Sequence, residues 1–312
     1  MTPRLSIGLP VFNGAAHLRE AVDSLLAQSF RDFELILCDN ASTDATDAIC
    51  RGYARHDERV RHYRSPRNRG ACCNFNWTVE LARGQYFKWA AHDDWHAPEY
   101  LERCVAALDA DPSLVGCHTH VRVVDGGGAP LLDHIYPPGH ASSPDPVRRF
   151  ADMLREDRWG LEFFGVFRTS VLRRTGLLGA YVASDRTLRA HLGLLGRLHT
   201  VPEPLFFNRD HPDRSIRRLP AHHMRVEWYD PAQAGRRVFP HWRILGEYAR
   251  LLRVGELSRD QRRRGRMVLL RWLGQDMNWA RLGADLVIAV APGAWRILAR
   301  VARQRLEPLA AD

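Results

Sequence analysis

Short apolar runs alternate with amphipathic stretches over the first part of this chain. Leu5–Val11 and Phe33–Cys38 are apolar runs typical of buried strands, and Ala15–Gln28 between them repeats its apolar residues at helical spacing. The same patterns predict further strands at Val60–Tyr63, Tyr86–Ala91 and Val115–Val124, and helices from Ser42 to about Arg55, at Gly70–Ala82 and at Glu99–Leu108. Strands that alternate with helices predict an α/β fold with a mainly parallel sheet flanked by helices.

The pattern becomes less regular after Val124. Asp125–Pro144 is rich in Gly, Pro and Ser, so we expect a loop or an excursion at the sheet edge. Short strands are expected at Phe163–Phe167 and Val201–Phe207, and helices at Val147–Arg155 and Ser184–Leu195. From His222 onward the pattern is helical and rich in arginine. We expect a main domain over residues 1–217, with halves at 1–125 and 126–217, and a helical C-terminal appendage over 218–312.

Composition adds a strongly basic balance to this picture. The 312 residues are 45% hydrophobic, which is enough to fill a core, and the net charge is +9. Lys88 is the only lysine, so nearly all the positive charge is arginine. This balance favours anionic partners such as nucleotide phosphates, nucleic acid or an acidic membrane face. No nucleic-acid motif occurs and the arginines are dispersed, so we expect no nucleic-acid partner.

Cysteine usage and hydropathy predict a cytoplasmic protein. The six cysteines include no C-x-x-C pair, which indicates a reducing compartment and no zinc site. A strand begins almost at the N-terminus, which leaves no room for a signal peptide. The nearest approach to a transmembrane run, Leu286–Val301, is interrupted by Pro292 and Arg296. The basic C-terminal segment also carries Trp242, Trp272, Trp279 and Trp295. Three interpretations of this segment remain: peripheral contact with the inner face of the cell membrane, a helical cap, and a dimer contact.

Polar side chains follow three of the predicted strands. They stand at Pro10–Gly14, at Asp39–Ser42 and at Asp93–Asp94. Parallel strands bring their carboxyl ends to one sheet edge, where ligands bind. Adjacent carboxylates repel each other, so Asp93 and Asp94 favour a divalent cation, with a solvated turn as the alternative. No G-x-G-x-x-G or G-x-x-x-x-G-K-[ST] follows the first strand, which disfavours a dinucleotide fold and excludes a P-loop.

The motifs at these strand ends resemble those of family 2 glycosyltransferases. Ser6–Gly14 resembles the opening strand and loop of that family, and Asp39–Asp44 its second-strand signature. Asn68–Gly70 with Asn76 resembles the third element, and Ala82–Tyr86 with His92–Asp94 resembles the metal and diphosphate segment. The resemblance covers about Leu5 to His211. It implies a Rossmann-like GT-A fold that moves a sugar, with inversion, from a nucleotide-diphosphate donor to an acceptor hydroxyl. The simplest donor is a UDP-sugar, and a glycan, a lipid-linked molecule or a small molecule could accept.

The resemblance also implies roles for matching residues. The nucleotide pocket would be lined by Pro10, Phe12, Asn13, Asp39, Asn40, Arg69 and Asp93. Asp39 would accept a hydrogen bond from the base, with a helix-capping carboxylate as the alternative. Arg69 would reach the base or a phosphate, with a solvated arginine as the alternative. Mn²⁺ or Mg²⁺ would be held by Asp93, Asp94 and His211, although a lone histidine is often structural. Asp185, at a predicted helix start, would be the general base, or else only a helix-terminal charge.

Two departures from the family pattern keep other functions open. Ala91 stands where many relatives carry the first Asp of Asp-x-Asp, and Ser184 stands where they often carry Glu before the catalytic Asp. A catalytically impaired nucleotide-sugar-binding or regulatory relative is therefore an alternative. A sugar-phosphate nucleotidyltransferase is a further one, but the glycine-rich, basic loop that it would need after the first strand is missing.

Overall fold

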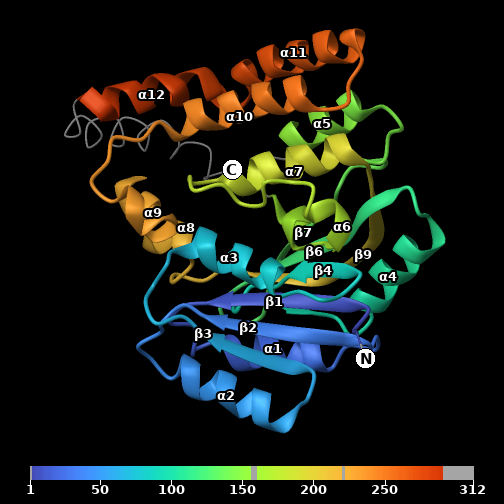
Figure 1. Cartoon of the computed structure of the whole chain (residues 1–312), viewed down its shortest axis with the longest axis vertical. Helices are drawn as coiled ribbons and strands as arrows, with labels where there is room; N and C mark the ends of the chain where they lie inside the picture. Colours follow the sequence, from blue (N-terminus) through green and yellow to red (C-terminus); the bar gives the residue numbers. More distant parts are fainter. Residues whose placement is uncertain (1, 156–159, 220–221, 291–312) are drawn as a thin grey trace. The chain divides into compact units, whose positions relative to one another are not determined.

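The computed structural model describes residues 2–155, 160–219 and 222–290, and the chain divides into two compact units, Met1–Ala234 and Gly235–Asp312 (Figure 1). The division falls later than the boundary expected at residue 217. Helices α8 (Ser215–Arg218) and α9 (His222–Tyr229) belong to the first unit, because Tyr229 at the end of α9 is buried in a core cluster with Cys72.

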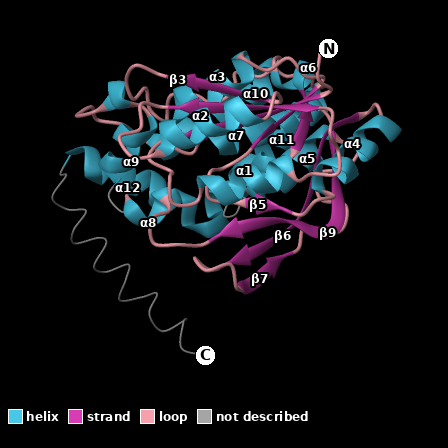
Figure 2. Ribbon diagram, turned by 90° about the horizontal axis from the view of Figure 1, so that it is seen from below, coloured by secondary structure: helices cyan, strands magenta, loops and turns pink. Residues whose placement is uncertain are grey.

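One mixed sheet organises the first unit. Its strands are β1 (Leu5–Val11), β2 (Phe33–Asp39), β3 (Val60–Arg64), β4 (Tyr86–Trp89), β5 (Trp95–His96), β6 (Leu114–Val124), β7 (Pro130–His134), β8 (Val166–Arg168) and β9 (Arg197–Arg209). They follow the order β3-β2-β1-β4-β8-β6-β9-β5, and β7 pairs with β6 at the sheet edge (Figure 2). Strands β1 to β4 form a parallel block as expected. The later part is mixed, because β5, β7 and β8 all pair antiparallel to their neighbours.

Helices cover both faces of this sheet. They are α1 (Leu18–Leu26), α2 (Thr46–His56), α3 (Ala71–Glu80), α4 (Tyr100–Ala110), α5 (Pro146–Arg155), α6 (Thr169–Leu172) and α7 (Ser184–Leu195). Side chains alternate along β2, so Leu35 and Leu37 join one core cluster with residues of α1, α2 and α4. Ile36 and Cys38 join the other cluster, with residues of α3, α5, α6 and α7. The apolar runs of the sequence are thus strands buried on both faces.

The second half of the sheet departs from the expected pattern in two places. Leu161–Phe164 forms a 3-10 turn, η1, and only Val166–Arg168 is a strand. Gly160 at φ 62° allows the chain to turn there. Strand β9 runs unbroken through Pro202 and Pro204, since register shifts in its pairing with β6 accommodate the missing N–H donors.

The second unit is helical, as predicted. Helices α10 (Pro240–Val254), α11 (Arg259–Gly274) and α12 (Asn278–Val290) all pack against one another, and the short turn η3 (Gln275–Met277) joins α11 to α12. Their shared core includes Ile244, Tyr248, Leu251, Trp272 and Leu282. No helix within the described ranges is long and apolar enough to cross a bilayer. Trp295 and the end of the Leu286–Val301 stretch lie outside the described residues.

Candidate functional site

The carboxyl ends of β1, β2 and β4 meet at one sheet edge, as the sequence predicted. The loops after β1 and β2 are joined by hydrogen bonds from Asn13 N to Ser42 Oγ (2.9 Å) and from Thr43 N to Asn13 Oδ1 (2.8 Å). Asn13 and Ala41 both have left-handed backbones, at φ 51° and 63°. Such strained conformations persist where the surrounding contacts fix them, and they cluster at ligand sites. The predicted nucleotide loops are therefore held in a defined shape before any ligand binds.

Asp39 is buried at the end of β2 beside an arginine that the sequence did not indicate. Its Oδ1 accepts a hydrogen bond from Ser42 N (2.9 Å), and its Oδ2 accepts one from Arg64 Nη1 (2.9 Å). Arg64 Nη2 also donates to Ser42 O (2.9 Å). The pairing of β2 with β3 sets Arg64 directly opposite Asp39. No local signal marks Arg64, since its place depends on that strand register.

A second carboxylate, Asp47, lies in the same cluster. One ligand atom each of Asp39, Asp47 and His62 lie within 4.8 Å of one another, a grouping that could surround a cation. Arg64 lies 3.3 Å from Asp47 Oδ2, and Arg51 donates to the same oxygen at 2.9 Å. These guanidinium groups already neutralise the carboxylates, so the cluster needs no metal ion.

The other predicted nucleotide residues surround the same loops. Pro10 is buried in β1 and Phe12 is exposed. The Asn40 side chain accepts a hydrogen bond from Arg69 N (2.9 Å) and donates one to Asn68 Oδ1 (2.8 Å), so it shapes the loop before α3. The exposed Arg69 guanidinium lies 5.6 Å from the centre of a tryptophan ring in α3.

Asp93 and His211, far apart in sequence, come together beyond β4. His211 Nε2 lies 3.0 Å from Asp93 Oδ2, and the Asp93 carboxylate is partly exposed. Burial favours the neutral form of Asp93, but the hydrogen bond from His211 and the proximity of His92 outweigh it and lower the Asp93 pKa. Within the described chain, the buried Nδ1 of His211 makes no hydrogen bond. The pair could therefore offer a cation the Asp93 carboxylate and His211 Nε2, with the proton of the ring on Nδ1.

Two further histidines stand beside this pair. The ring of His17, just before α1, lies 4.8 Å from that of His211 between centroids. Burial, reinforced by the charge of Arg209, lowers the His17 pKa and favours its neutral form. His92 packs against Gly14, where a Cβ would lie 2.5 Å from its ring. No motif in the sequence associates His17 with the site.

Asp94 has a different environment from its neighbour. It is almost fully buried, and both of its oxygens accept hydrogen bonds from Asn208 Nδ2 at 3.1 Å. Oδ1 also accepts one from Arg209 N at 2.8 Å. Burial and repulsion from Asp93 raise the Asp94 pKa. Its carboxylate therefore fixes the end of β9 to the loop after β4.

Arg209 brings a fixed positive charge to the same place. Its guanidinium lies 4.5 Å from the centre of the Trp95 ring and pairs with Glu20 of α1. Nε donates to the Asp93 carbonyl at 3.0 Å. Trp95 itself stacks on Phe207, with ring centroids 5.3 Å apart. The guanidinium is thus held in place on the side of the site that β9 forms.

Asp93 and His211 fit a divalent cation better than Asp94 does. Their donor atoms are a partly exposed carboxylate oxygen and the imidazole Nε2, whereas both Asp94 oxygens already accept hydrogen bonds. Nitrogen donors suit Mn²⁺ better than Mg²⁺, which prefers an all-oxygen shell. Ala91 supplies no ligand at the position where relatives carry their first Asp.

Asp185 stands in the first turn of α7, as the sequence predicted. The helix begins after Ala183, whose backbone is left-handed at φ 63°. Ser184 Oγ bonds Tyr229 Oη at 2.6 Å. Burial raises the pKa of Tyr229, and the charges of Cys72 and then Asp185 raise it further. Asp185 therefore lies near the Tyr229 hydroxyl. In the described residues no hydrogen bond or ion pair joins Asp185 to Asp93 or His211.

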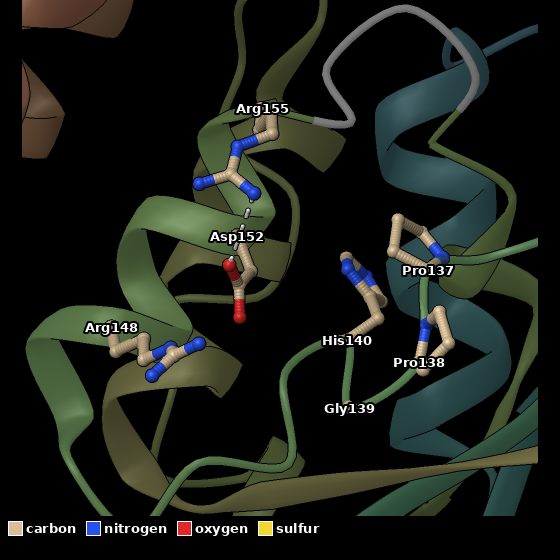
Figure 3. A pocket seen from close by; sticks show the side chains of 7 residues that line it. All are labelled: Pro137, Pro138, Gly139, His140, Arg148, Asp152 and Arg155. Carbon is tan, nitrogen blue, oxygen red and sulfur yellow. Dashed lines mark ion pairs between the residues drawn. The ribbon is translucent and has the colours of Figure 1, made fainter.

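A small pocket of about 80 Å³ opens elsewhere in this unit, beside His140 (Figure 3). It is lined by Pro137, Pro138, Gly139, His140, Arg148, Asp152 and Arg155. Pockets that hold drug-sized ligands have about 300 Å³ or more, so this one is too small for a nucleotide sugar.

The parallel block and the polar residues at its carboxyl edge define the GT-A class of glycosyltransferase fold. The sequence model described as "Glycosyl transferase family 2" matches residues 6–178, more than half of the chain. The chain belongs to glycosyl transferase family 2.

Individual relatives agree with this assignment. EpsE of Bacillus subtilis, which is named as a glycosyltransferase, is 31% identical over 164 residues. These residues cover 49% of this chain and 56% of EpsE. The chain thus spans about half the length of EpsE. The structure of S. aureus TarS matches with a TM-score of 0.65 at 16% identity, covering 92% of this chain and 81% of that one. The mannosyltransferase PcManGT from Pyrobaculum calidifontis matches with a TM-score of 0.56 at 20% identity, covering 98% and 81%. At these identities the two structures show a shared fold.

Proposed function

We propose that this chain is an inverting glycosyltransferase that moves a sugar from a nucleotide-diphosphate donor to an acceptor hydroxyl. The observation that carries this proposal is the meeting of Asp39, the Asn13 loop and the Asp93–His211 pair at one sheet edge. TarS has been solved with UDP and with UDP-GlcNAc, and PcManGT with GDP-Man and Mn²⁺. Those complexes, on the same fold, support a nucleotide sugar as donor, and we take a UDP-sugar as the first choice.

The nucleotide is assigned to the loops after β1 and β2. Asp39 would accept the N–H of the base through a second lone pair of one of its oxygens, and the neighbouring Arg64 holds that carboxylate in place through a charge-assisted hydrogen bond. Pro10, Phe12, Asn13 and Asn40 form or shape the walls around it. The exposed Arg69 would reach the base or a phosphate.

The diphosphate is assigned to the Asp93–His211 pair. These residues would hold Mn²⁺ or Mg²⁺, and the bound cation supplies Lewis-acid neutralisation of the leaving diphosphate. Arg209 contributes a positive charge that is already oriented by Trp95 and Glu20. Asp94 holds the end of β9 against the loop after β4, so we assign it the role of positioning that loop. It could also contact the waters of the cation.

The acceptor hydroxyl is assigned to Asp185 as general base. Inversion requires the acceptor to attack from the face opposite the nucleotide, and a carboxylate there must take its proton. Asp185 is half-buried at a helix start, a suitable place for a fixed carboxylate. A glycan, a lipid-linked molecule or a small molecule could supply the hydroxyl.

Metal-dependent donor binding tests the diphosphate assignment. We expect UDP to bind at least about tenfold more tightly with Mn²⁺ than without it, and Asp93→Ala and His211→Ala to remove that difference. Isothermal titration of UDP, with and without Mn²⁺, measures both effects. Asp213→Ala is the matched control, because this exposed carboxylate near the site should leave the Mn²⁺ effect unchanged. Full Mn²⁺ dependence in Asp93→Ala would contradict the assignment.

Transfer tests the base assignment separately. Asp185→Asn should bind UDP within about twofold of the parent yet lose at least about 10²-fold in transfer, the range that general bases contribute. The assay uses UDP-, GDP- and dTDP-sugars with a panel of acceptors, and normal transfer by Asp185→Asn would refute the base role. The Ser184–Tyr229 bond and Ala91 favour one second candidate, a relative that binds donors without transferring them. Donor binding without transfer or hydrolysis across the whole panel would support that candidate.

A further inference from the structure

Helix α12 presents an apolar stripe to its exposed side. Trp279, Leu286, Val287 and Val290 are all exposed, Trp279 by 61% and Val290 by 80%. Their spacing, with Gly283 between them, places them on one face of the helix. The buried face carries Leu282 and Ala289 together with two polar residues, Asn278 and Asp285. Four large apolar side chains of α12 are thus exposed while two polar side chains are buried, which is unusual for a helix that faces water.

Hydrogen bonds fix this orientation of α12. Asp285 Oδ2 accepts a hydrogen bond from His241 N (2.8 Å), and its Oδ1 lies 2.9 Å from His241 Nδ1. Asn278 Nδ2 donates to Trp272 O at 2.9 Å. Turning the helix to bury its apolar stripe would break these bonds and leave their polar groups unsatisfied, which costs more than the bonds themselves contribute. The exposed stripe is therefore part of the folded unit.

Helix α11 has an exposed stripe of its own, in which apolar and basic residues are mixed. Met267 and Leu270 are exposed, and Arg263, Arg266 and Arg271 lie beside them at helical spacing. Figure 1 shows α11 and α12 one after the other along α10, against which both pack. We call the exposed side chains Arg263, Arg266, Met267, Leu270, Arg271, Trp279, Leu286, Val287 and Val290 the outer face.

The whole charge excess of the protein lies in the unit that carries this face. Residues 235–312 contain 16 arginines and 7 acidic residues, a net charge of +9. Residues 1–234 contain 29 basic and 29 acidic residues and are neutral. Ten of the sixteen large apolar side chains that are exposed in the described ranges also lie in the second unit.

We propose that the outer face binds the surface of an anionic phospholipid bilayer. Its apolar side chains would enter the boundary between headgroups and acyl chains, with α11 and α12 lying in the plane of the membrane. The arginines would bind lipid phosphates, and each would add to the attraction toward a negatively charged surface. Trp279 has the aromatic, amphipathic character of residues found at this interface.

A second copy of the chain fits this face less well. A symmetric dimer through the outer face would bring two units of charge +9 against each other, which long-range repulsion opposes. A bilayer with acidic headgroups supplies both the apolar layer and the opposite charge.

Co-sedimentation of the full chain with vesicles tests the proposal. One set of vesicles is pure phosphatidylcholine, and the other contains about 30% phosphatidylglycerol, an anionic lipid that gives the surface the negative potential on which this attraction depends. We expect partition into the anionic vesicles only. Leu286→Asp/Val290→Asp should abolish it, and Arg263→Gln/Arg266→Gln/Arg271→Gln should weaken it on the order of a hundredfold.

Controls separate this proposal from folding and from donor binding. Leu131→Asp/Leu132→Asp changes exposed apolar residues of β7 in the first unit and should leave partition unchanged. Far-UV circular dichroism checks that each variant keeps its helices, and UDP binding with Mn²⁺ is measured on the same samples. Equal partition of the parent and the outer-face variants would overturn the proposal, as would equal binding to both kinds of vesicle. A dimer that Leu286→Asp dissociates, with no vesicle binding, would show that a second copy covers the face.

Discussion

Lys88 is a completely buried cation at the centre of the main sheet. Its Nζ donates hydrogen bonds to Phe164 O (2.6 Å) and Trp89 O (3.1 Å) and lies 4.6 Å from the centre of the Tyr100 ring. Burial lowers its pKa to about 7. Lys88 thus ties β4, which leads to the diphosphate site, to η1, at the cost of a buried amine that protonates less readily.

This amine should give the protein a recognisable pH dependence. Because the folded pKa, about 7, lies below the ordinary value of 10.5, the unfolded chain binds the extra proton between these limits. Stability should therefore rise with pH across this window, by up to about 1.4 kcal/mol per pH unit, and be lost as pH falls toward 7. In Lys88→Met this part of the rise should be absent. Urea unfolding from about pH 7 to about pH 8.5 measures this rise in the free energy of unfolding, with Arg55→Met as an exposed control. Parallel pH curves for the Lys88→Met variant and the parent would contradict the prediction.

Between neighbouring elements, a buried ion pair joins η1 to α7. Glu162 is fully buried and lies 3.3 Å from Arg189 Nη1 and 3.0 Å from His140 Nε2. Burial opposes the charge of Glu162, but Arg189 and His140 outweigh it and lower the pKa to about 2. The pair therefore fixes the helix whose first turn carries Asp185.

Removing one partner of this pair should cost far more than removing a surface charge. Glu162→Gln leaves Arg189 buried without its carboxylate, so we expect a loss of about 3–5 kcal/mol in the free energy of unfolding. Glu162→Leu/Arg189→Met should recover much of it. Glu203→Gln, which breaks an exposed pair with Arg103, should cost less than about 1 kcal/mol. Urea unfolding at neutral pH compares the three, and a Glu162→Gln loss as small as the Glu203→Gln loss would show that the pair does not hold α7.

The Glu162 contribution also has a direction in pH. Its folded pKa of about 2 lies below the ordinary 4.5, so its stabilisation is complete above that value and is lost as pH falls from about 4.5 to 2.

The chain consists of a neutral α/β unit and a basic helical unit. The boundary after Ala234, rather than at residue 217, follows from α9, since Tyr229 and Val226 are buried within the first unit. Tyr229 also bonds Ser184 at the start of α7.

Two truncated chains test this boundary. A chain that ends at Ala234 should fold and bind UDP with Mn²⁺ within about threefold of the full chain. A chain that ends at Arg217 lacks Tyr229 and should be less stable by about 3–5 kcal/mol, the cost of deleting a large buried aromatic side chain. Thermal unfolding and UDP titration compare the two. Equal stability of both chains would place the boundary at 217.

Local pattern alone was enough to predict many elements of the first unit. The structure has strand β1 at Leu5–Val11 and helix α7 at Ser184–Leu195, the ranges that periodicity predicted, because each segment's spacing of apolar residues is that of its own secondary structure. The meeting of the β1, β2 and β4 ends also followed from sequence, since consecutive right-handed crossovers align parallel strands. The sequence likewise marked Asp39 and Asp93 at the ends of strands, and the resemblance to family 2 glycosyltransferases marked Asp185 at a helix start.

The surroundings of those residues, in contrast, came from tertiary contacts. Arg64 reaches Asp39 through strand register, and His17 reaches His211 through packing across most of the first unit. Asp93 and Asp94 are neighbours with equal chemistry in sequence, but β9 occupies the oxygens of one and leaves the other partly exposed. The apolar side of α12 faces outward because buried bonds of Asp285 and Asn278 fix its rotation. Such outcomes depend on contacts between distant segments, which periodicity along the chain does not encode.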